Sequence, residues 1–145
     1  MDNYRLGSEP EVEVETACKL EIKLILGFEE YIGKGTYKEI PENLEEFRDK
    51  RVLIVDSGDE SLELAIKLTD YTGRVIVTTT SKEIPGREAI AKKLKHSDVK
   101  ILRQSELIEI KGQLDEVEKV VLHDFDEDEN YELFSDAVVY LDYRG

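Results

Sequence analysis

The sequence has 145 residues, with 34 Asp and Glu against 20 Lys and Arg, and a formal net charge of -14. This length predicts one domain, or one domain with an arm, and the 40% apolar content excludes a wholly disordered chain. The acid excess disfavours nucleic acid phosphates and anionic membrane surfaces as partners. No apolar run reaches membrane-spanning length, and residues 1–4 lack a signal-peptide pattern, so we expect a soluble, cytoplasmic protein.

The chain has a single cysteine, Cys18, which permits neither an internal disulfide nor a dithiol redox pair. No histidine flanks it, so we interpret it as a small, half-buried side chain rather than an activated nucleophile. Low Cys and Met content, together with abundant Glu and Lys, favours a thermophilic source.

The first third of the chain predicts little regular structure. Residues 1–15 are polar and acidic and are expected to form an extended arm. Apolar and charged residues alternate from 17 to 26, which predicts a strand whose apolar face includes Leu24. Residues 27–50 contain several glycines and Pro41, the composition of an irregular connector.

Strand-like and helix-like segments then alternate. Continuous apolar runs predict buried strands at 52–55 and 75–77, and residues 99–102 predict a third strand. Helical spacing predicts a helix over 57–71 and a second helix that Pro85 opens. This βαβαβ order is typical of a parallel sheet with right-handed crossovers, and therefore of an α/β fold.

The pattern changes in the last third. Three short strands follow one another, and their ranges are 107–110, 117–123 and 131–134. They are joined by 111–116 and by the acidic segment 124–130, which predicts a three-stranded antiparallel meander. The apolar segment 137–141 is expected to return to the parallel sheet as a central strand.

The turn after the first buried strand is the usual phosphate-binding position of such a sheet. Compared with the dinucleotide fingerprint G-x-G-x-x-G/A, only the middle glycine remains, as Gly58. Asp56 stands at the tight-turn position and Ser61 at the close-packing position. The fingerprint is therefore degenerate in this chain.

Acidic residues surround the same helix start. Asp56, Asp59 and Glu60 place up to three carboxylates where they would compete for backbone N–H groups and repel an anion. Ser57 and Glu60 have the spacing of a capping box. We therefore expect a helix that caps itself in preference to binding a pyrophosphate.

The end of the next strand carries the second nucleotide determinant, an acid for NAD or an arginine for NADP. Residues 78–81 are Thr, Thr, Thr and Ser, and the nearby Lys82 and Arg87 are expected at the solvated surface. The residues that remain for a degenerate cofactor-binding site at the strand ends are Asp56, Gly58, Asp59, Ser61, Thr79, Thr80 and Lys82. No catalytic residue and no metal ligand is assigned.

Residues 50–65, and then Val75 onward, resemble the NADPH-binding domain of thioredoxin reductases, within the pyridine nucleotide-disulfide oxidoreductases. That family writes K-R-V-x-V-x-G-G-G-D-S-A-x-E-E-A, and Asp59, Glu63 and Ala65 match its Asp, first Glu and last Ala without a gap.

The similarity extends on both sides of this motif. Residues 27–35 are similar to the family's G-E-E-E-F-x-G-R-G connection, and 136–143 to its last strand. The resemblance implies a Rossmann-like FAD/NAD(P)-binding fold. It divides the chain into an arm and strand (1–26), a connector (27–50) and an NAD(P)-binding-type domain (51–145).

The departures from the family are equally informative. The family's C-A-T-C falls on residues 39–42, where Glu39 and Glu42 replace both cysteines. Its phosphate-binding H-R-R-x-x-x-R falls on residues 79–85 without any arginine. The flavin domain is expected to be absent, so FAD is not expected as a cofactor and NAD(P) is disfavoured.

Three functions stay open. The first is a non-catalytic, degenerate relative that binds a partner protein or regulates it. The second is a nucleotide-binding component that works with a separate flavoprotein subunit. The third is a binder of another small ligand or a cation at the strand-end cleft. The acidic segment 124–130 lacks the glycine and glutamate that an EF-hand requires, so we interpret it as a solvated hairpin loop.

Overall fold

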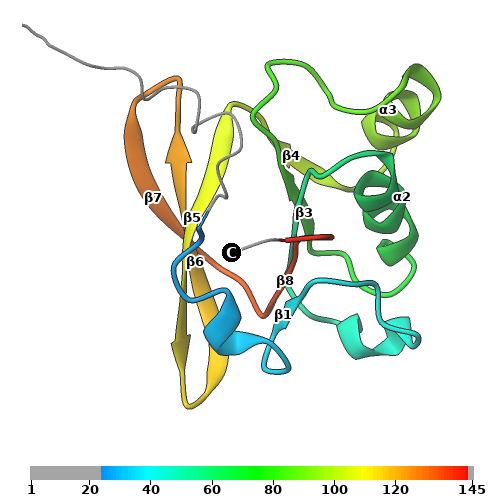
Figure 1. Ribbon diagram of the computed structural model, residues 1–145. Coiled ribbons are helices and arrows are strands. Elements are labelled where there is room, and N and C mark those ends of the chain that lie inside the picture. Colours follow the sequence, from blue (N-terminus) through cyan, green and yellow to red (C-terminus); the bar gives the residue numbers. More distant parts are fainter. Residues whose placement is uncertain (1–23, 144–145) are drawn as a thin grey trace, which may run out of the picture.

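Two sheets face each other in residues 24–143, the part of the chain that this computed structural model describes. Helices α2 and α3 cover the outer face of the parallel sheet, and the antiparallel sheet lies against its inner face (Figure 1). The predicted α/β fold with a separate meander is therefore confirmed. None of the helices in this part of the chain is long and apolar enough to cross a membrane.

The first eight elements build the connector and most of the parallel sheet. They are the 3-10 helix η1 (Glu29–Tyr31), β1 (Thr36–Tyr37), the 3-10 helix η2 (Leu44–Phe47), β2 (Val52–Val55), α2 (Asp59–Leu68), β3 (Val75–Thr78), α3 (Glu88–Lys95) and β4 (Lys100–Leu102). The last four are β5 (Ser105–Gln113), β6 (Glu116–Asp124), β7 (Glu129–Phe134) and β8 (Ala137–Val139).

The parallel sheet has the strand order β1-β8-β2-β3-β4. Strand β8 lies between β1 and β2, with Leu53 paired to Val138, so its predicted return to the interior of the sheet is confirmed. Strands β2 and β3 pair in register from Val52 and Val75 onward. Their carboxyl ends therefore meet at one edge of the sheet.

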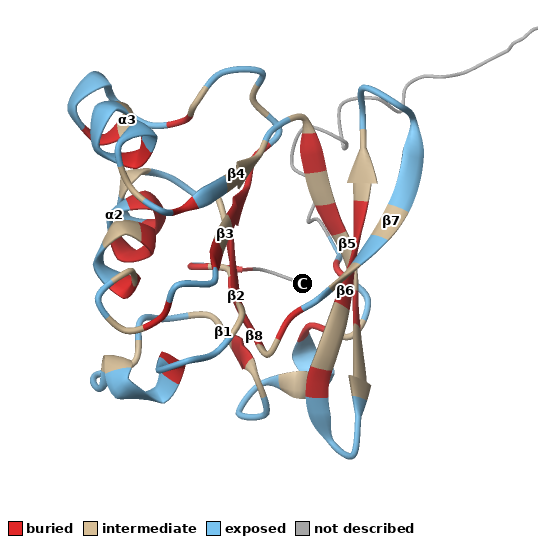
Figure 2. Ribbon diagram, turned by 180° about the vertical axis from the view of Figure 1, so that it is seen from behind, coloured by how far each residue is buried: buried red, intermediate tan, exposed pale blue. Residues whose placement is uncertain are grey.

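Strand β2 divides its side chains between two cores. Ile54 packs with the buried residues under α2 and α3, whereas Leu53 packs against the antiparallel sheet. Because neighbouring side chains of a strand point to opposite faces, a continuous apolar run suits a strand covered on both sides. Figure 2 shows that buried residues occur in the strands of both layers.

The antiparallel sheet has the order β5-β6-β7, as the sequence predicts. Its first hairpin turns at Leu114 and Asp115, whose φ angles of 55° and 65° suit a tight turn between twisted strands. In the acidic loop, Asp124 Oδ1 accepts hydrogen bonds from the backbone N–H of Asp126 (2.8 Å) and Glu127 (3.3 Å). The loop thus uses one of its own carboxylates to close the hairpin.

The connector is more regular than the sequence predicts. It contributes two 3-10 helices and β1, which pairs with β8 through Thr36 and Val138. The expected apolar face of the 17–26 strand is wrong at the end that the structure describes, because Leu24 is 70% exposed and Ile25 only 6%. The predicted arm, Cys18 and most of that strand lie outside the described residues. The division at residues 26 and 50 stays a prediction.

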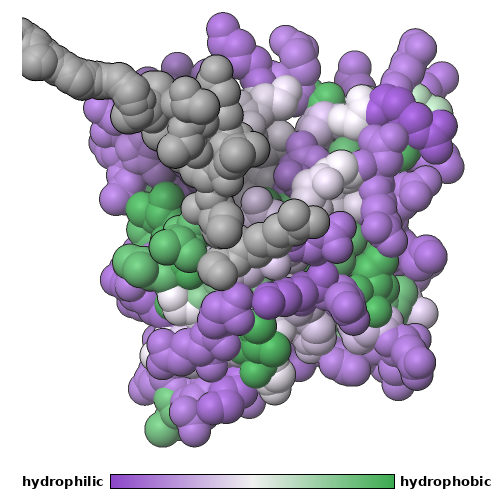
Figure 3. Space-filling model, viewed as in Figure 1, coloured by the Kyte–Doolittle hydropathy of each residue, from purple (hydrophilic) through white to green (hydrophobic). Residues whose placement is uncertain are grey.

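Hydrophilic residues cover most of the described surface in the view of Figure 3, and hydrophobic residues gather there in a few separate patches. The exposed large apolar side chains are spread over the chain: Leu24, Leu26, Ile32, Ile40, Leu114, Phe125 and Phe134. Scattered apolar residues of this kind are normal on a solvated surface.

Candidate functional site

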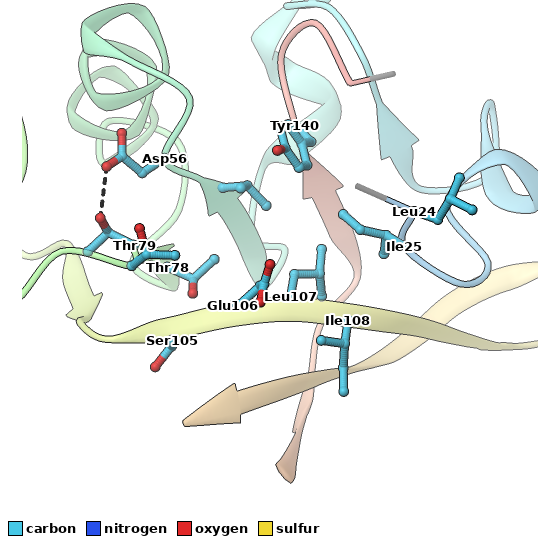
Figure 4. A pocket seen from close by; sticks show the side chains of 12 residues that line it. Leu24, Ile25, Asp56, Thr78, Thr79, Ser105, Glu106, Leu107, Ile108 and Tyr140 are labelled. Atoms are coloured by element: carbon cyan, nitrogen blue, oxygen red, sulfur yellow. Dashed lines mark hydrogen bonds between the residues drawn. The ribbon is translucent and has the colours of Figure 1, made fainter. Parts of the chain in front are cut away.

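A cavity of about 510 Å³ opens at the carboxyl ends of β2 and β3, on the side where β5 crosses (Figure 4). We call it the strand-end cavity. Its lining residues are Leu24, Ile25, Val55, Asp56, Thr78, Thr79, Thr80, Ser105, Glu106, Leu107, Ile108 and Tyr140. Its volume lies within the range of small-molecule sites, about 300 to 1,000 Å³.

Asp56 is held in a fixed position at the edge of this cavity. Its Oδ2 accepts a hydrogen bond from the Thr79 hydroxyl (2.8 Å), and its Oδ1 accepts one from the backbone N–H of Gly58 (3.2 Å). Its own backbone N–H donates to the carbonyl of Thr78 (2.9 Å). The predicted residues Asp56, Gly58 and Thr79 are thus brought together, and the carboxylate takes a backbone donor of the phosphate-binding turn.

The predicted capping box at the start of α2 is wrong. The N-cap is Gly58, with a φ of 127° that favours glycine, and no side chain caps the helix. Ser61 instead accepts a hydrogen bond from the Ser57 N–H (3.0 Å) and donates one to the Gly58 carbonyl (2.6 Å). The hydroxyl of Ser61 therefore closes the turn from inside the helix, and this fixes Ser57 before the helix begins.

Four of the seven predicted site residues do not line the cavity: Gly58, Asp59, Ser61 and Lys82. Asp59 pairs with Arg87, whose Nε lies 3.3 Å from Oδ2 and whose backbone N–H donates to Oδ1 over 3.3 Å. This pair links the starts of α2 and α3. Lys82 is exposed and lines a different hollow beside Arg103, whereas Thr80 does line the strand-end cavity.

Sequence reasoning missed part of the lining. Thr78 is only 1% exposed, and its Oγ1 has no hydrogen-bond partner among the described residues. Glu106 and Leu107 come from β5, and Tyr140 follows β8. The threonine ending a buried apolar strand was a visible signal, but nothing local in the sequence predicts which face of β5 meets it.

The resemblance places Glu39 and Glu42 at the positions of the family's cysteines, and both lie between β1 and η2. Glu39 lines an open groove together with Tyr37 and Ile40. The Tyr37 hydroxyl donates to Glu46 Oε1 over 3.0 Å, and burial together with this carboxylate raises the pKa of Tyr37 to about 12. The groove therefore holds a neutral phenol beside carboxylates, with no thiol among the described residues.

Metal-binding chemistry finds little support in residues 24–143, because no three His, Cys, Asp or Glu side chains there form a group that could hold an ion. His123 is engaged by its neighbours in β7 and the acidic loop: Nδ1 lies 2.7 Å from Asn130 Oδ1, and Nε2 lies 3.4 Å from Asp128 Oδ1.

The family model described as "Pyridine nucleotide-disulphide oxidoreductase" matches residues 51–129. The chain belongs to this family. That match begins just before β2 and ends at Glu129, the first residue of β7, so it includes the turn after β2 and the strands β2 to β6.

Curated relatives agree with this assignment. The chain is 32% identical over 92 residues to "Ferredoxin--NADP reductase 1" of Bacillus velezensis, a match covering 63% of the chain and 27% of the relative. It is 30% identical over 119 residues to "Ferredoxin--NADP reductase" of Thermus thermophilus, covering 79% of the chain and 35% of the relative. The chain thus spans about a third of the length of these relatives.

Solved structures confirm the Rossmann-like fold and the resemblance to thioredoxin reductases. The thioredoxin reductase of Lactococcus lactis superposes with a TM-score of 0.75 at 24% identity, over 81% of this chain and 39% of that one. A thioredoxin reductase from Gloeobacter violaceus gives 0.71 at 28% identity, over 83% and 37%. The chain is therefore an oxidoreductase domain that is similar to thioredoxin reductases and to ferredoxin–NADP reductases.

Proposed function

We propose that this domain does not catalyse electron transfer by itself, and that it acts in the cytoplasm by binding a partner protein or regulating it. The observation that carries the proposal is the hydrogen bond from the Gly58 N–H to Asp56. A pyrophosphate binds at such a turn because free backbone N–H groups and the helix dipole face it. In this chain the Asp56 carboxylate accepts one of these N–H groups in place of a phosphate oxygen.

Further residues support the same conclusion. The Ser57 N–H is bonded to Ser61, so a second donor of the turn is engaged. The positions of the family's redox cysteines hold Glu39 and Glu42, which cannot form a disulfide. In this proposal NAD(P) is disfavoured as a ligand, FAD is not bound, and electrons have no dithiol to reach in the connector.

A second candidate is a nucleotide-binding component that works with a separate flavoprotein subunit. It is favoured by the preserved shape of the turn, since Gly58 keeps its positive φ and a Cβ there would meet no atom within 4 Å. The start of α2 also has no side-chain cap. A nucleotide that displaced Asp56 would therefore meet an open turn.

Titration of the full chain with NADPH, NADH and FAD, followed by amide chemical shifts, separates the two candidates. The proposal predicts no saturable shifts at Ser57, Gly58 or Asp59 up to millimolar nucleotide. Saturable shifts at Gly58 would overturn it in favour of the second candidate. In that case NADPH oxidation should appear only when a flavoprotein is added.

A further inference from the structure

The strand-end cavity contains a buried polar atom that forms no hydrogen bond with any described residue. Thr78 is 1% exposed, lines the cavity, and leaves its Oγ1 without a hydrogen-bond partner among the described residues. A buried hydroxyl without a partner is rare in folded proteins, because its lost contact with water is not replaced. A ligand that donates or accepts a hydrogen bond at this position would satisfy it.

The charge of the lining selects the sign of that ligand. Asp56 contributes a carboxylate, and no Lys or Arg is among the described lining residues. The carboxylate of Asp56 accepts one hydrogen bond on each oxygen, and each oxygen keeps a further lone pair for another donor. An anion would be repelled there, whereas an ammonium group would gain charge-assisted hydrogen bonds.

The lining is also divided in space. In Figure 4, Asp56, Thr78 and Thr79 lie at one end of the cavity, and Leu24 and Ile25 lie at the other. Leu107 and Tyr140 line the space between them. A ligand that fills the cavity therefore needs a polar head and an apolar body.

Tyr140 adds an aromatic wall between the two ends of the cavity. Its ring lies 6.3 Å from that of Phe28 at an interplanar angle of 89°, and 5.3 Å from that of Tyr143. These contacts hold the ring in place, so a ligand does not have to order it. A fixed aromatic ring at this place can pack against the body of a ligand whose polar head lies at Asp56.

We propose that the strand-end cavity binds a small organic cation, in which an ammonium head lies between Asp56 and Thr78 and an apolar or aromatic body packs toward Ile25 and Leu107. A bare metal ion fits less well, because residues 24–143 bring no three metal-binding side chains together. This ligand class differs from a nicotinamide nucleotide, whose pyrophosphate would carry negative charge toward Asp56.

Three probes of nearly equal size and different charge test the proposal on the full chain: phenethylammonium, phenethyl alcohol and phenylacetate. Phenethylammonium should give saturable amide shifts at Thr79, Leu107 and Tyr140, with about tenfold higher affinity than the alcohol, a difference of about 1.4 kcal/mol. Phenylacetate should give none. Equal affinity for the cation and the alcohol, or no saturable shift with the cation at millimolar concentration, would overturn the proposal.

Substitutions test which residues bind the ammonium group. Asp56→Asn should remove most of the preference for the cation over the alcohol, whereas the control Asp70→Asn, an equal charge change on an exposed residue beyond α2, should retain it. Thr78→Val keeps the shape of the side chain and should weaken phenethylammonium binding several-fold without lowering the melting temperature. An equal loss of preference in both aspartate variants, or unchanged binding in Thr78→Val, would contradict the assigned pose.

This test is independent of the proposed function. Nucleotide binding would be reported by the amides of Ser57 and Asp59 at the start of α2, whereas phenethylammonium would be reported by Leu107 in β5 and Tyr140 after β8. The Gly58 amide does not separate the two, because its N–H donates to Asp56 and either ligand would shift it. A chain that binds NADPH and not the cation therefore differs clearly from one that binds the cation and not NADPH.

Discussion

The Thr79 hydroxyl donates a 2.8 Å hydrogen bond to Oδ2 of Asp56, and this bond joins the carboxyl ends of β3 and β2. The same carboxylate accepts the Gly58 N–H through its other oxygen. One side chain thus links two neighbouring strands and the first turn of α2. Its removal should change both the ligand preference and the rigidity of this edge of the sheet.

Replacement of Asp56 tests whether acidity blocks the nucleotide site. Asp56→Gly frees the Gly58 N–H and removes a negative charge from the helix start, so NADPH affinity should rise by about tenfold or more. Adding Ser61→Ala frees the Ser57 N–H and should raise it further. Isothermal titration calorimetry measures both steps. A similar gain in Asp70→Asn would show that net charge alone matters, contrary to this prediction.

Thr78 and Thr79 form a matched pair for stability. Thr78→Val replaces a buried hydroxyl that has no partner in residues 24–143, so the free energy of unfolding should increase by about 1 kcal/mol. Thr79→Val removes the hydrogen bonds to Asp56 and to the Ser81 N–H, so the free energy of unfolding should decrease by about 1 kcal/mol or more. Urea denaturation of the two variants gives both values. Destabilisation by Thr78→Val would indicate that its hydroxyl has a partner in the folded chain.

Asp136 should contribute stability that depends on pH. Arg51 donates to both carboxylate oxygens, each over 3.1 Å, and these hydrogen bonds hold the pKa of Asp136 below its usual value. A carboxyl whose pKa is lowered by folding contributes fully above its unfolded pKa, and this contribution is lost as the pH falls through the folded value. Both side chains are more than a third exposed, so solvent screening limits the effect to about 1 kcal/mol.

Urea denaturation of Asp136→Asn measures this contribution. The variant should be less stable than the wild type at pH 7, and the difference should shrink as the pH falls below the ordinary pKa of an aspartate, about 3.9. A difference that stays constant down to strongly acidic pH would contradict the ion pair as its source.

Alanine substitutions at two glycines of the connector distinguish the cost of backbone strain from the cost of steric contact. Both have positive φ angles, 83° at Gly33 and 128° at Gly35. A Cβ at Gly33 would meet no atom within 4 Å, whereas one at Gly35 would lie 2.7 Å from Val117 Cγ2 and 3.1 Å from the Asp136 carbonyl oxygen.

Gly33→Ala should therefore cost about 1 kcal/mol from backbone strain alone, and Gly35→Ala should cost about 3 kcal/mol. Thermal or urea unfolding distinguishes the two. Equal losses would mean that the connector does not pack on β6 at Gly35 as the structure has it.

Much of the fold could be predicted because its signals are local. The run from Val52 to Val55 is apolar without alternation, which marks a strand covered on both faces. Asp56 and Thr79 follow neighbouring parallel strands, so their meeting at one edge follows from strand direction alone. Together with Thr80, these two residues form the part of the cavity lining that sequence reasoning could place.

The remainder depends on contacts between distant residues. Strand β1 is only two residues long and is fixed by pairing with β8, about a hundred positions later, so no periodic pattern reveals it. At the start of α2, the Ser57 N–H donates to the Ser61 hydroxyl, and the spacing of residues in the sequence could not predict this bond. The far wall of the strand-end cavity, including Leu107, depends on how one sheet packs against the other.

The position of β8 between β1 and β2 constrains how this chain can fold. Strands β2, β3 and β4 are joined by short crossovers and can assemble early, whereas β1 gains its neighbour only through a very long loop closure. Until Ala137–Val139 insert, β1 and β2 each present an open edge of unpaired backbone groups, which readily pairs with other chains. Completion of this sheet is therefore a late folding step, and a nascent chain that has not yet reached it is the form most exposed to aggregation.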